Sequence, residues 1–365
     1  MRATTAALCR GPVGPFFIEP VEVAAPVGDE VLVRVVAAGI CHTDLTGRAA
    51  AALGGPVLLG HEGAGVVQEV GPETTGIQSG DHVVLSFRSC GRCRRCTVGQ
   101  PAYCAGRAAL NSVGGRGDGS PTVRAGGTPV LAGFVGQSSF AGYALAHQDN
   151  TVVVDPDVDL VVAAPFGCGF QTGAGAVLNV LRPDESSTVV VYGAGSVGLA
   201  GLLAARSAGA AVIVVEVSPR RRDLALRLGA AHAVDPTDTN VTAAVADLTA
   251  GGSTHALDTT GAAAVIQAAV KALAPTGVAV TVGLGRPELQ LDVLDLVYGG
   301  KSLRGCLEGD AVPTTFIPYL LELHAADRFP VDQLVTTFPL ARINEAVAAQ
   351  RAGDAVKAVL LPDAP

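Results

Sequence analysis

The chain has 365 residues, 49% of them hydrophobic and 16% charged, which is enough for two domains of ordinary size. Its formal net charge of −8 argues against a nucleic-acid partner. No apolar run reaches the roughly 18 residues of a membrane span, and the first residues lack the apolar core of a signal peptide. We therefore expect a soluble, cytoplasmic protein with no membrane partner, in which eight cysteines favour metal binding over disulfides.

Short strands separated by glycine turns come first along the chain. Residues 30–37, 63–70 and 82–85 have the alternation of strands, which predicts a small β-barrel. Cys41, His61 and, much later, Cys168 could form the Cys₂His ligand set of a catalytic zinc that keeps its fourth position open. Their wide spacing alone is weak support, because a buried cysteine is usually only a small apolar side chain.

A cluster of four cysteines follows, and its spacing is typical of a closed structural zinc site. Interleaved arginines could suggest a nucleic-acid-binding zinc knuckle, but they also offset the negative charge of four thiolates, and we prefer that interpretation. The glycine-rich residues 111–130 are expected to form a loop near the site, and residues 134–145 to lead from a loop into a strand. The four cysteines are Cys90, Cys93, Cys96 and Cys104.

The stretch 188–216 has the order of a dinucleotide-binding unit. A buried strand ends at a G-x-G-x-x-G motif, a helix follows to about residue 208, and a second strand ends at Glu216. In such a unit the first glycine makes the turn, the second lets the backbone approach the diphosphate, and the third packs helix on strand. The helix N-terminus favours the anion, and Glu216 is expected at the adenosine ribose. The motif comprises Gly193, Gly195, Ser196, Val197 and Gly198, with Ala194 between the first two.

Helices and strands alternate from about residue 170 to residue 305, which predicts a doubly wound parallel sheet. Two helices and two strands then remain, at 313–326, 333–337, 343–351 and 355–361, and we expect them to complete the first domain. The predicted domains are therefore 1–169 with 306–365, including a zinc lobe at about 88–106, and 170–305.

The order of these motifs resembles that of the zinc-dependent medium-chain alcohol dehydrogenases, along essentially the whole chain. Further motifs, Cys41-His-Thr-Asp-Leu45 and the segment 308–318, resemble the aryl (benzyl) alcohol dehydrogenases and related bacterial terpene-alcohol enzymes. The resemblance implies an α/β protein with a GroES-like β-barrel catalytic domain and a Rossmann coenzyme domain. It also implies two zinc ions per chain and a homodimer or homotetramer.

The resemblance further assigns roles around the catalytic zinc. Cys41, His61 and Cys168 would bind the metal, and Glu62 stands at the position of a nearby carboxylate or transient ligand. Thr43 stands where a hydroxyl binds the alcohol. Liver-type enzymes end their proton relay in a histidine at the position of Thr46. The proton route here, through His42, through water or with no dedicated base, therefore stays open.

Cofactor and substrate contacts are implied in the same way. The positions are His42 and Lys357 at the diphosphate, and Thr172, Val282 and Leu284 at the nicotinamide. The positions in the substrate pocket are Ser86, Phe134, Val135 and Leu284. Because Ser86 is small, we expect a pocket that accepts a primary aromatic or allylic alcohol better than ethanol.

Cofactor choice depends on charges that oppose each other. Glu216 would repel the 2′-phosphate of NADP, whereas Arg220, Arg221 and Arg222 could bind it. The arginines also fit the solvated first turn of a helix, with one of them, Arg221, beside the adenine. We give the acid more weight because it ends the strand itself, so NAD is expected and NADP is less favoured.

These features predict a zinc- and NAD-dependent alcohol dehydrogenase. Alternatives of the same fold are a thiol-dependent formaldehyde dehydrogenase and an aldehyde reductase of a natural-product pathway. A zinc-stabilised nucleotide sensor is the non-enzyme alternative, and it leaves Thr43 and Glu62 beside the three ligands unexplained.

Overall fold

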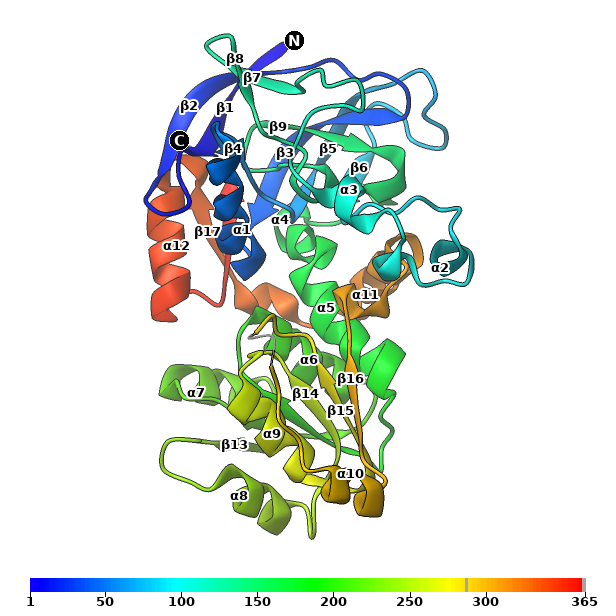
Figure 1. Cartoon of the computed structure of the whole chain (residues 1–365), viewed down its shortest axis with the longest axis vertical. Coiled ribbons are helices and arrows are strands. Elements are labelled where there is room, and N and C mark those ends of the chain that lie inside the picture. Colours follow the sequence, from blue (N-terminus) through cyan, green and yellow to red (C-terminus); the bar gives the residue numbers. More distant parts are fainter. Residues whose placement is uncertain (286–287, 363–365) are drawn as a thin grey trace. The chain divides into compact units, whose positions relative to one another are not determined.

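The computed structural model describes residues 1–285 and 288–362 and divides into two compact units (Figure 1). Unit 1 consists of Met1–Cys168, Val312–Glu322 and Asp332–Pro365. Unit 2 consists of Gly169–Ala311 and Leu323–Val331. The C-terminal part of the chain thus returns to the unit in which the chain begins.

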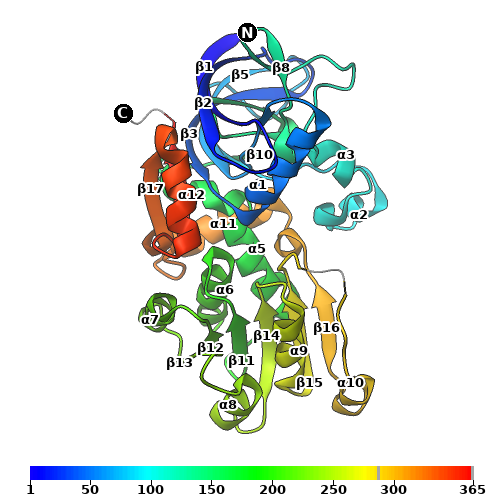
Figure 2. The same ribbon diagram turned by 60° about the vertical axis from the view of Figure 1, so that its left-hand side comes forward.

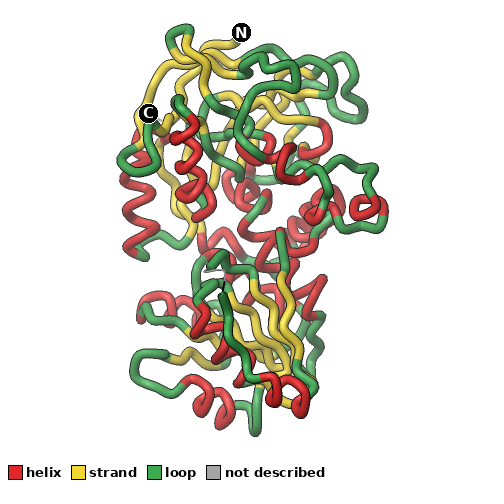
Figure 3. The backbone as a smooth tube through the Cα atoms, in the orientation of Figure 1, coloured by secondary structure: helices red, strands yellow, loops and turns green. Residues whose placement is uncertain are grey.

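Unit 1 is built on two largely antiparallel sheets, seen in Figure 3 as the yellow strands near the N and C labels. One has the order β4-β1-β2-β7-β8, and the other has the order β10-β6-β5-β3-β18-β17, with β9 also paired to β3. The first comprises β1 (Arg2–Cys9), β2 (Phe16–Val23), β4 (Val57–Leu58), β7 (Val123–Ala125) and β8 (Thr128–Val130). The second comprises β3 (Glu30–Gly39), β5 (Gly63–Val70), β6 (His82–Leu85), β9 (Tyr143–His147), β10 (Thr151–Val154), β17 (Val335–Pro339) and β18 (Lys357–Leu361).

A continuous apolar core joins the two sheets of unit 1. Val and Leu side chains of β1, β3 and β6 meet those of the C-terminal helix α12 and strand β18, so the two ends of the chain share one core. Helices in this unit are mostly short. They are α1 (His42–Gly47), α2 (Arg94–Thr97), α3 (Arg107–Asn111), α4 (Leu160–Ala163) and α12 (Ile343–Ala352); α11 (Pro313–Ala325) begins in unit 1.

Unit 2 is a six-stranded parallel sheet among the described residues, with the order β13-β12-β11-β14-β15-β16. This is the 3-2-1-4-5-6 order of the Rossmann fold, and it confirms the predicted fold class. The strands are β11 (Thr188–Tyr192), β12 (Ala211–Val215), β13 (His232–Val234), β14 (Ser253–Asp258), β15 (Leu273–Thr281) and β16 (Ser302–Gly305).

Helices cover both faces of this sheet, as Figure 2 shows. On one face α5 packs on α6, where Gly173 comes so near the backbone of Val197 that a side chain would not fit. On the other face α8 and α9 bury valines and alanines against β11 to β15. The helices are α5 (Gly169–Gly175), α6 (Ser196–Ser207), α7 (Pro219–Arg227), α8 (Val241–Leu248), α9 (Ala263–Lys271) and α10 (Val293–Gly299).

Several elements differ from those expected from the sequence. The structure adds β1, β2, α10 and β16, and β17 begins two residues later than expected. Residues 111–130 are not wholly a loop, because β7 and β8 form a hairpin whose turn, Gly126-Gly127, has positive φ at both residues. Among the described residues no single helix is long and apolar enough to cross a membrane, although the bent pair Leu160–Gly167 and Gly169–Leu181 together pass that test.

Candidate active site and cofactor site

Unit 1 brings together the three ligands expected for the catalytic metal. Candidate ligand atoms of Cys41, His61, Glu62 and Cys168 all lie within 4.8 Å of one another. Cys41 immediately precedes α1, His61 and Glu62 lie between β4 and β5, and Cys168 follows a short helical turn. Within that turn, a Cβ on Gly167 would lie 2.1 Å from the carbonyl oxygen of Leu85, so a side chain would not fit there.

Asp44 orients the histidine of this cluster, a role that the sequence analysis did not assign. Its fully buried carboxylate lies 2.7 Å from Nδ1 of His61 and accepts the backbone N–H groups of Cys41 and Gly60. Nε2 of His61 is buried and has no hydrogen-bond partner among the described residues. A carboxylate on one ring nitrogen and an unpartnered second nitrogen beside two thiols are what a zinc ligand requires, so the residues fit the metal.

The thiols of this cluster are also suited to a cation. A hydrogen bond from Cys168 lowers the pKa of the Cys41 thiol well below its usual value, against the opposing effect of burial, and His61 adds to the lowering. A thiolate is the form of cysteine that binds zinc.

Lys357 forms a buried ion pair with Glu62. Its Nζ is 2.9 and 2.8 Å from the two carboxylate oxygens of Glu62 and donates to the carbonyl of Ile40, and both side chains are at most 1% exposed. These three acceptors use all three protons of the ammonium group. A diphosphate contact of Lys357 would require it to exchange one of these bonds, so the expected contact stays a prediction. Burial raises the pKa of Glu62 to about 7, although Lys357 opposes the shift.

The four cysteines of the lobe form the second cluster that could hold a metal. Their sulfur atoms lie within 4.8 Å of one another, and backbone N–H groups point at three of them. The N–H of Ala105 is the largest cause that lowers the pKa of Cys93, to about 6. Such bonds stabilise thiolates, so this lobe fits a closed four-sulfur zinc site.

The glycine motif has the geometry of a diphosphate cradle in unit 2. Gly193 has φ of 91°, and a Cβ on Gly198 would lie 1.9 Å from the carbonyl oxygen of Gly193, so both positions need glycine. Gly195 differs, because its φ is −77° and a Cβ there would meet nothing within 4 Å. The fold itself therefore does not require Gly195, which leaves open space at the N-terminus of α6 where a diphosphate would lie.

Glu216 is held at the edge of this cradle. Its carboxylate oxygens accept the N–H groups of Ala194, at 2.6 Å, and Ser218, at 2.9 Å. Arg222 already has three partners. It donates to the carbonyls of Glu216 and Val217 and forms an ion pair with Asp235 at 2.7 Å. Arg222 could therefore bind a 2′-phosphate only by giving up this ion pair, and the choice between NAD and NADP stays a prediction.

A cavity of about 340 Å³ adjoins Glu216 within unit 2. Its lining includes the last residues of β11 and β12, the edge where Rossmann proteins bind nucleotides. The rest of the lining is mainly apolar and comes from α8 and α9. These residues are Val241, Ala264, Val265 and Ala268.

The residues expected in the substrate pocket do not share one environment. The ring of Phe134 stands edge-on to the ring of His61, with centroids 5.5 Å apart, and Val135 beside it is half-buried with φ of 50°. Ser86 is fully buried, and its hydroxyl donates to the carbonyl of Gly167 at 2.7 Å. Leu284 belongs to unit 2, where it is 74% exposed.

The remaining expected contacts are accessible within their own units. In α1, His42 is exposed and Thr43 is half-buried, while Thr46 donates its hydroxyl to the carbonyl of Thr43. In unit 2, Thr172 on α5 and Val282 after β15 are half-buried.

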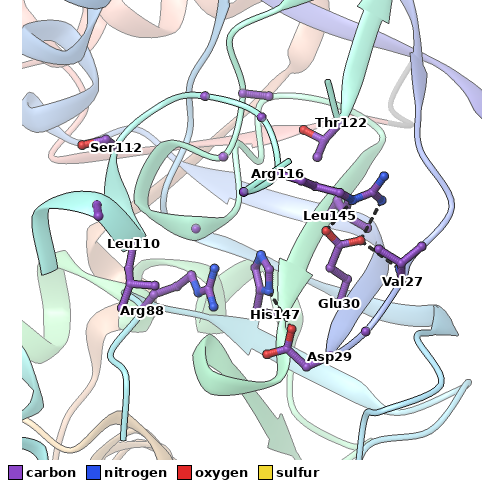
Figure 4. A pocket seen from close by; sticks show the side chains of 18 residues that line it. Val27, Asp29, Glu30, Arg88, Leu110, Ser112, Arg116, Thr122, Leu145 and His147 are labelled. Carbon is purple, nitrogen blue, oxygen red and sulfur yellow. Dashed lines mark hydrogen bonds and ion pairs between the residues drawn. The ribbon is translucent and has the colours of Figure 1, made fainter. Parts of the chain in front are cut away.

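A second cavity, of about 480 Å³, lies in unit 1 beneath the glycine-rich loop that was expected near the active site (Figure 4). Arg116 turns onto Glu30, and His147 turns onto Asp29. Each charged side chain in its lining has an opposite partner, so the cavity offers no uncompensated charge. The pairs are Arg116 with Glu30, His147 with Asp29, and Arg88 with Asp149.

Comparison with known proteins agrees with the metal cluster of unit 1 and with the nucleotide-binding fold of unit 2. Residues 28–156 match the family model described as alcohol dehydrogenase GroES-like domain, and residues 196–325 match that of zinc-binding dehydrogenase. Geraniol dehydrogenase of Castellaniella defragrans is 44% identical over 361 residues, which cover 98% of this chain and 97% of that protein. The chain belongs to the zinc-binding alcohol dehydrogenases.

Solved structures of members of this family superpose closely on the chain. An alcohol dehydrogenase zinc-binding domain protein from Burkholderia ambifaria has a TM-score of 0.97 at 45% identity and covers 100% of both chains. Benzyl alcohol dehydrogenase from Acinetobacter calcoaceticus has a TM-score of 0.94 at 39% identity and covers 99% of both chains. The family and the oxidoreductase class expected from the motifs are thereby confirmed, and the family implies a nicotinamide cofactor.

Proposed function

We infer that this alcohol dehydrogenase oxidises primary alcohols whose carbinol carbon is attached to an aromatic ring or a C=C bond, with NAD as acceptor. The Cys41–His61–Cys168 cluster carries the proposal, because it pairs an oriented histidine with two thiols beside Glu62. The aromatic ring of Phe134, edge-on to His61, supplies an apolar wall next to this cluster. The geraniol and benzyl alcohol dehydrogenases to which the chain is similar act on alcohols of this class.

Zinc, when bound by these residues, supplies a Lewis acid that polarises the oxygen of the alcohol or aldehyde, and nicotinamide accepts the hydride. Asp44 holds the His61 ring so that Nε2 points at the cluster. The Thr43 hydroxyl would take the hydroxyl proton of the alcohol while it passes its own proton onward, and the C–H electron pair would leave as hydride to the nicotinamide. Because the Thr46 hydroxyl is already bonded to the Thr43 carbonyl, we assign proton exit to the exposed His42.

The structure of unit 2 supports NAD over NADP. Glu216 is fixed by two backbone N–H groups, and each of its oxygens still has a lone pair for a ribose hydroxyl. The carboxylate would repel a 2′-phosphate at that place. Arg222 could bind the phosphate only if it broke its ion pair with Asp235. We therefore expect catalytic efficiency with NAD to exceed that with NADP by about tenfold or more.

A second copy of the chain is the partner that we propose for the outer edge of unit 2. Helix α10 exposes Val293, Leu294, Val297 and Tyr298, and β16 pairs with β15 alone among the described strands. Exposed apolar side chains beside an unpaired strand edge favour self-association, here into a homodimer or a pair of dimers. Light scattering from the intact protein measures the mass, and a monomer at micromolar concentration would refute this proposal.

Initial rates of NADH formation test the proposed function. Benzyl, cinnamyl and geranyl alcohols should each give a higher kcat/KM than ethanol, and NADP should be the poorer acceptor. Thr43→Val should lower kcat by at least about a hundredfold with every alcohol, since it removes the proton acceptor but keeps the shape. Higher efficiency with ethanol would contradict the substrate class. A requirement for formaldehyde plus a thiol would favour the thiol-dependent alternative.

A further inference from the structure

Tyr192 is a buried phenol that the proposed chemistry does not use. It ends β11, is 1% exposed, and lines the cavity beside Glu216. Val190, two residues earlier on the same strand face, belongs with Tyr192 to the apolar core formed with α8 and α9. The Tyr192 ring therefore forms part of the floor of an apolar cavity.

The Tyr192 hydroxyl has no hydrogen-bond partner among the residues that the structure describes. A buried hydroxyl without a partner costs about 1–3 kcal/mol, so its presence in an apolar core needs a reason. Phenylalanine would fill the same space without that cost. Burial also raises the pKa of Tyr192, with a smaller contribution from Asp258, so the hydroxyl keeps its proton and can donate.

The other polar side chains of the cavity are already engaged. Thr260 donates to Asp258 at 2.6 Å, and Glu216 can only accept hydrogen bonds. Tyr192 is thus the one lining side chain, among those described, with a proton to donate and no acceptor. A ligand in this cavity would be flat and apolar on its faces, with a hydrogen-bonding atom at its edge.

We propose that Tyr192 is a specificity-determining residue for the purine base of the cofactor, whose hydroxyl hydrogen-bonds the edge of the base. This inference rests on the proposed use of a nicotinamide adenine dinucleotide. The base lies between the side chains of α8 and α9 while Glu216 holds the adjoining ribose. The base thereby accepts a hydrogen bond from a hydroxyl that has no partner among the described residues.

Tyr192→Phe separates this role from a structural one, because its two effects have opposite signs. Without cofactor, Tm should stay the same or rise, since an unpaired polar atom is removed. The Kd of AMP and of NAD, from isothermal titration calorimetry, should rise about two- to tenfold, which is the value of one net hydrogen bond. Tyr319→Phe, which removes the hydroxyl of a tyrosine on α11 that is 44% exposed, should change neither Tm nor Kd.

Unchanged binding of AMP and NAD by Tyr192→Phe would overturn the inference, and so would a Tm that falls together with affinity. Purine riboside monophosphate and IMP, which differ from AMP only at position 6 of the base and its neighbour, provide a second test. The ratio of their Kd values to that of AMP should change in the variant if the hydroxyl reads the edge of the base, and an unchanged ratio would contradict this. If the unmodified protein binds no AMP or NAD, the proposed cofactor is wrong, which is a different failure.

Discussion

Sequence motifs predicted some of the residues around the metal cluster and missed the roles of others. Cys41, His61 and Cys168 could be named as ligands only because the order of motifs along the whole chain resembles that of a known family, since their own spacing is weak support. Asp44 was within a quoted motif, but its role depends on a contact with His61 that only folding creates. Lys357 illustrates the opposite case, since a lysine near the end of the chain gave no sign that its charge is buried against Glu62.

The Glu62–Lys357 pair makes a prediction at this scale. Lys357→Met should lower the free energy of unfolding by about 3–5 kcal/mol, because it leaves a buried carboxylate without its partner. Tm of the purified protein measures the loss. Glu62→Gln combined with Lys357→Met should recover part of it. Arg342→Met, which breaks the exposed pair with Glu345, should leave Tm nearly unchanged, because solvent screens exposed ion pairs. Equal Tm for Lys357→Met and the unmodified protein would contradict this account.

Elements with a regular pattern were predicted well, and those held by distant pairing were not. The strand–helix–strand unit at the cofactor was predicted because buried valines, glycines and an acid follow one another locally. Strands β1 and β2 were not predicted, because the Thr and Ala residues of β1 show little alternation of polar and apolar side chains. The two strands are instead held by pairing between eight residues of each. The β7–β8 hairpin had a usable signal in Gly126-Gly127, a pair suited to a tight turn.

The glycine motif allows function and folding to be separated within one element. Gly195→Ala should leave Tm unchanged, since the added methyl group meets no atom within 4 Å and φ is ordinary. The same methyl group would occupy the diphosphate cradle, so the Kd of NAD should rise by about tenfold or more. Gly198→Ala is the matched control, and it should destabilise the protein because its Cβ would overlap the Gly193 carbonyl. Undiminished NAD binding by a folded Gly195→Ala would show that the diphosphate lies elsewhere.

The whole molecule combines a zinc-binding unit and a nucleotide-binding unit in one chain, and its resemblance to known enzymes extends over nearly its full length. Composition and motif order were sufficient to predict this α/β class. The finer limits of the units were beyond the sequence, because residues 323–331 belong to unit 2 although their neighbours on both sides belong to unit 1. The path of the chain there depends on packing that no local pattern records.

The central claim is that the Cys41–His61–Cys168 cluster holds the zinc that alcohol oxidation requires, while the four-cysteine lobe holds a second zinc for folding. The most direct measurement is zinc content together with benzyl-alcohol-dependent NADH formation in Cys168→Ser. The account predicts two zinc ions per unmodified chain. It predicts that Cys168→Ser stays folded, binds NAD, retains only the lobe zinc and forms no NADH. Full activity in this variant, or an active unmodified protein with a single zinc or none, would contradict it.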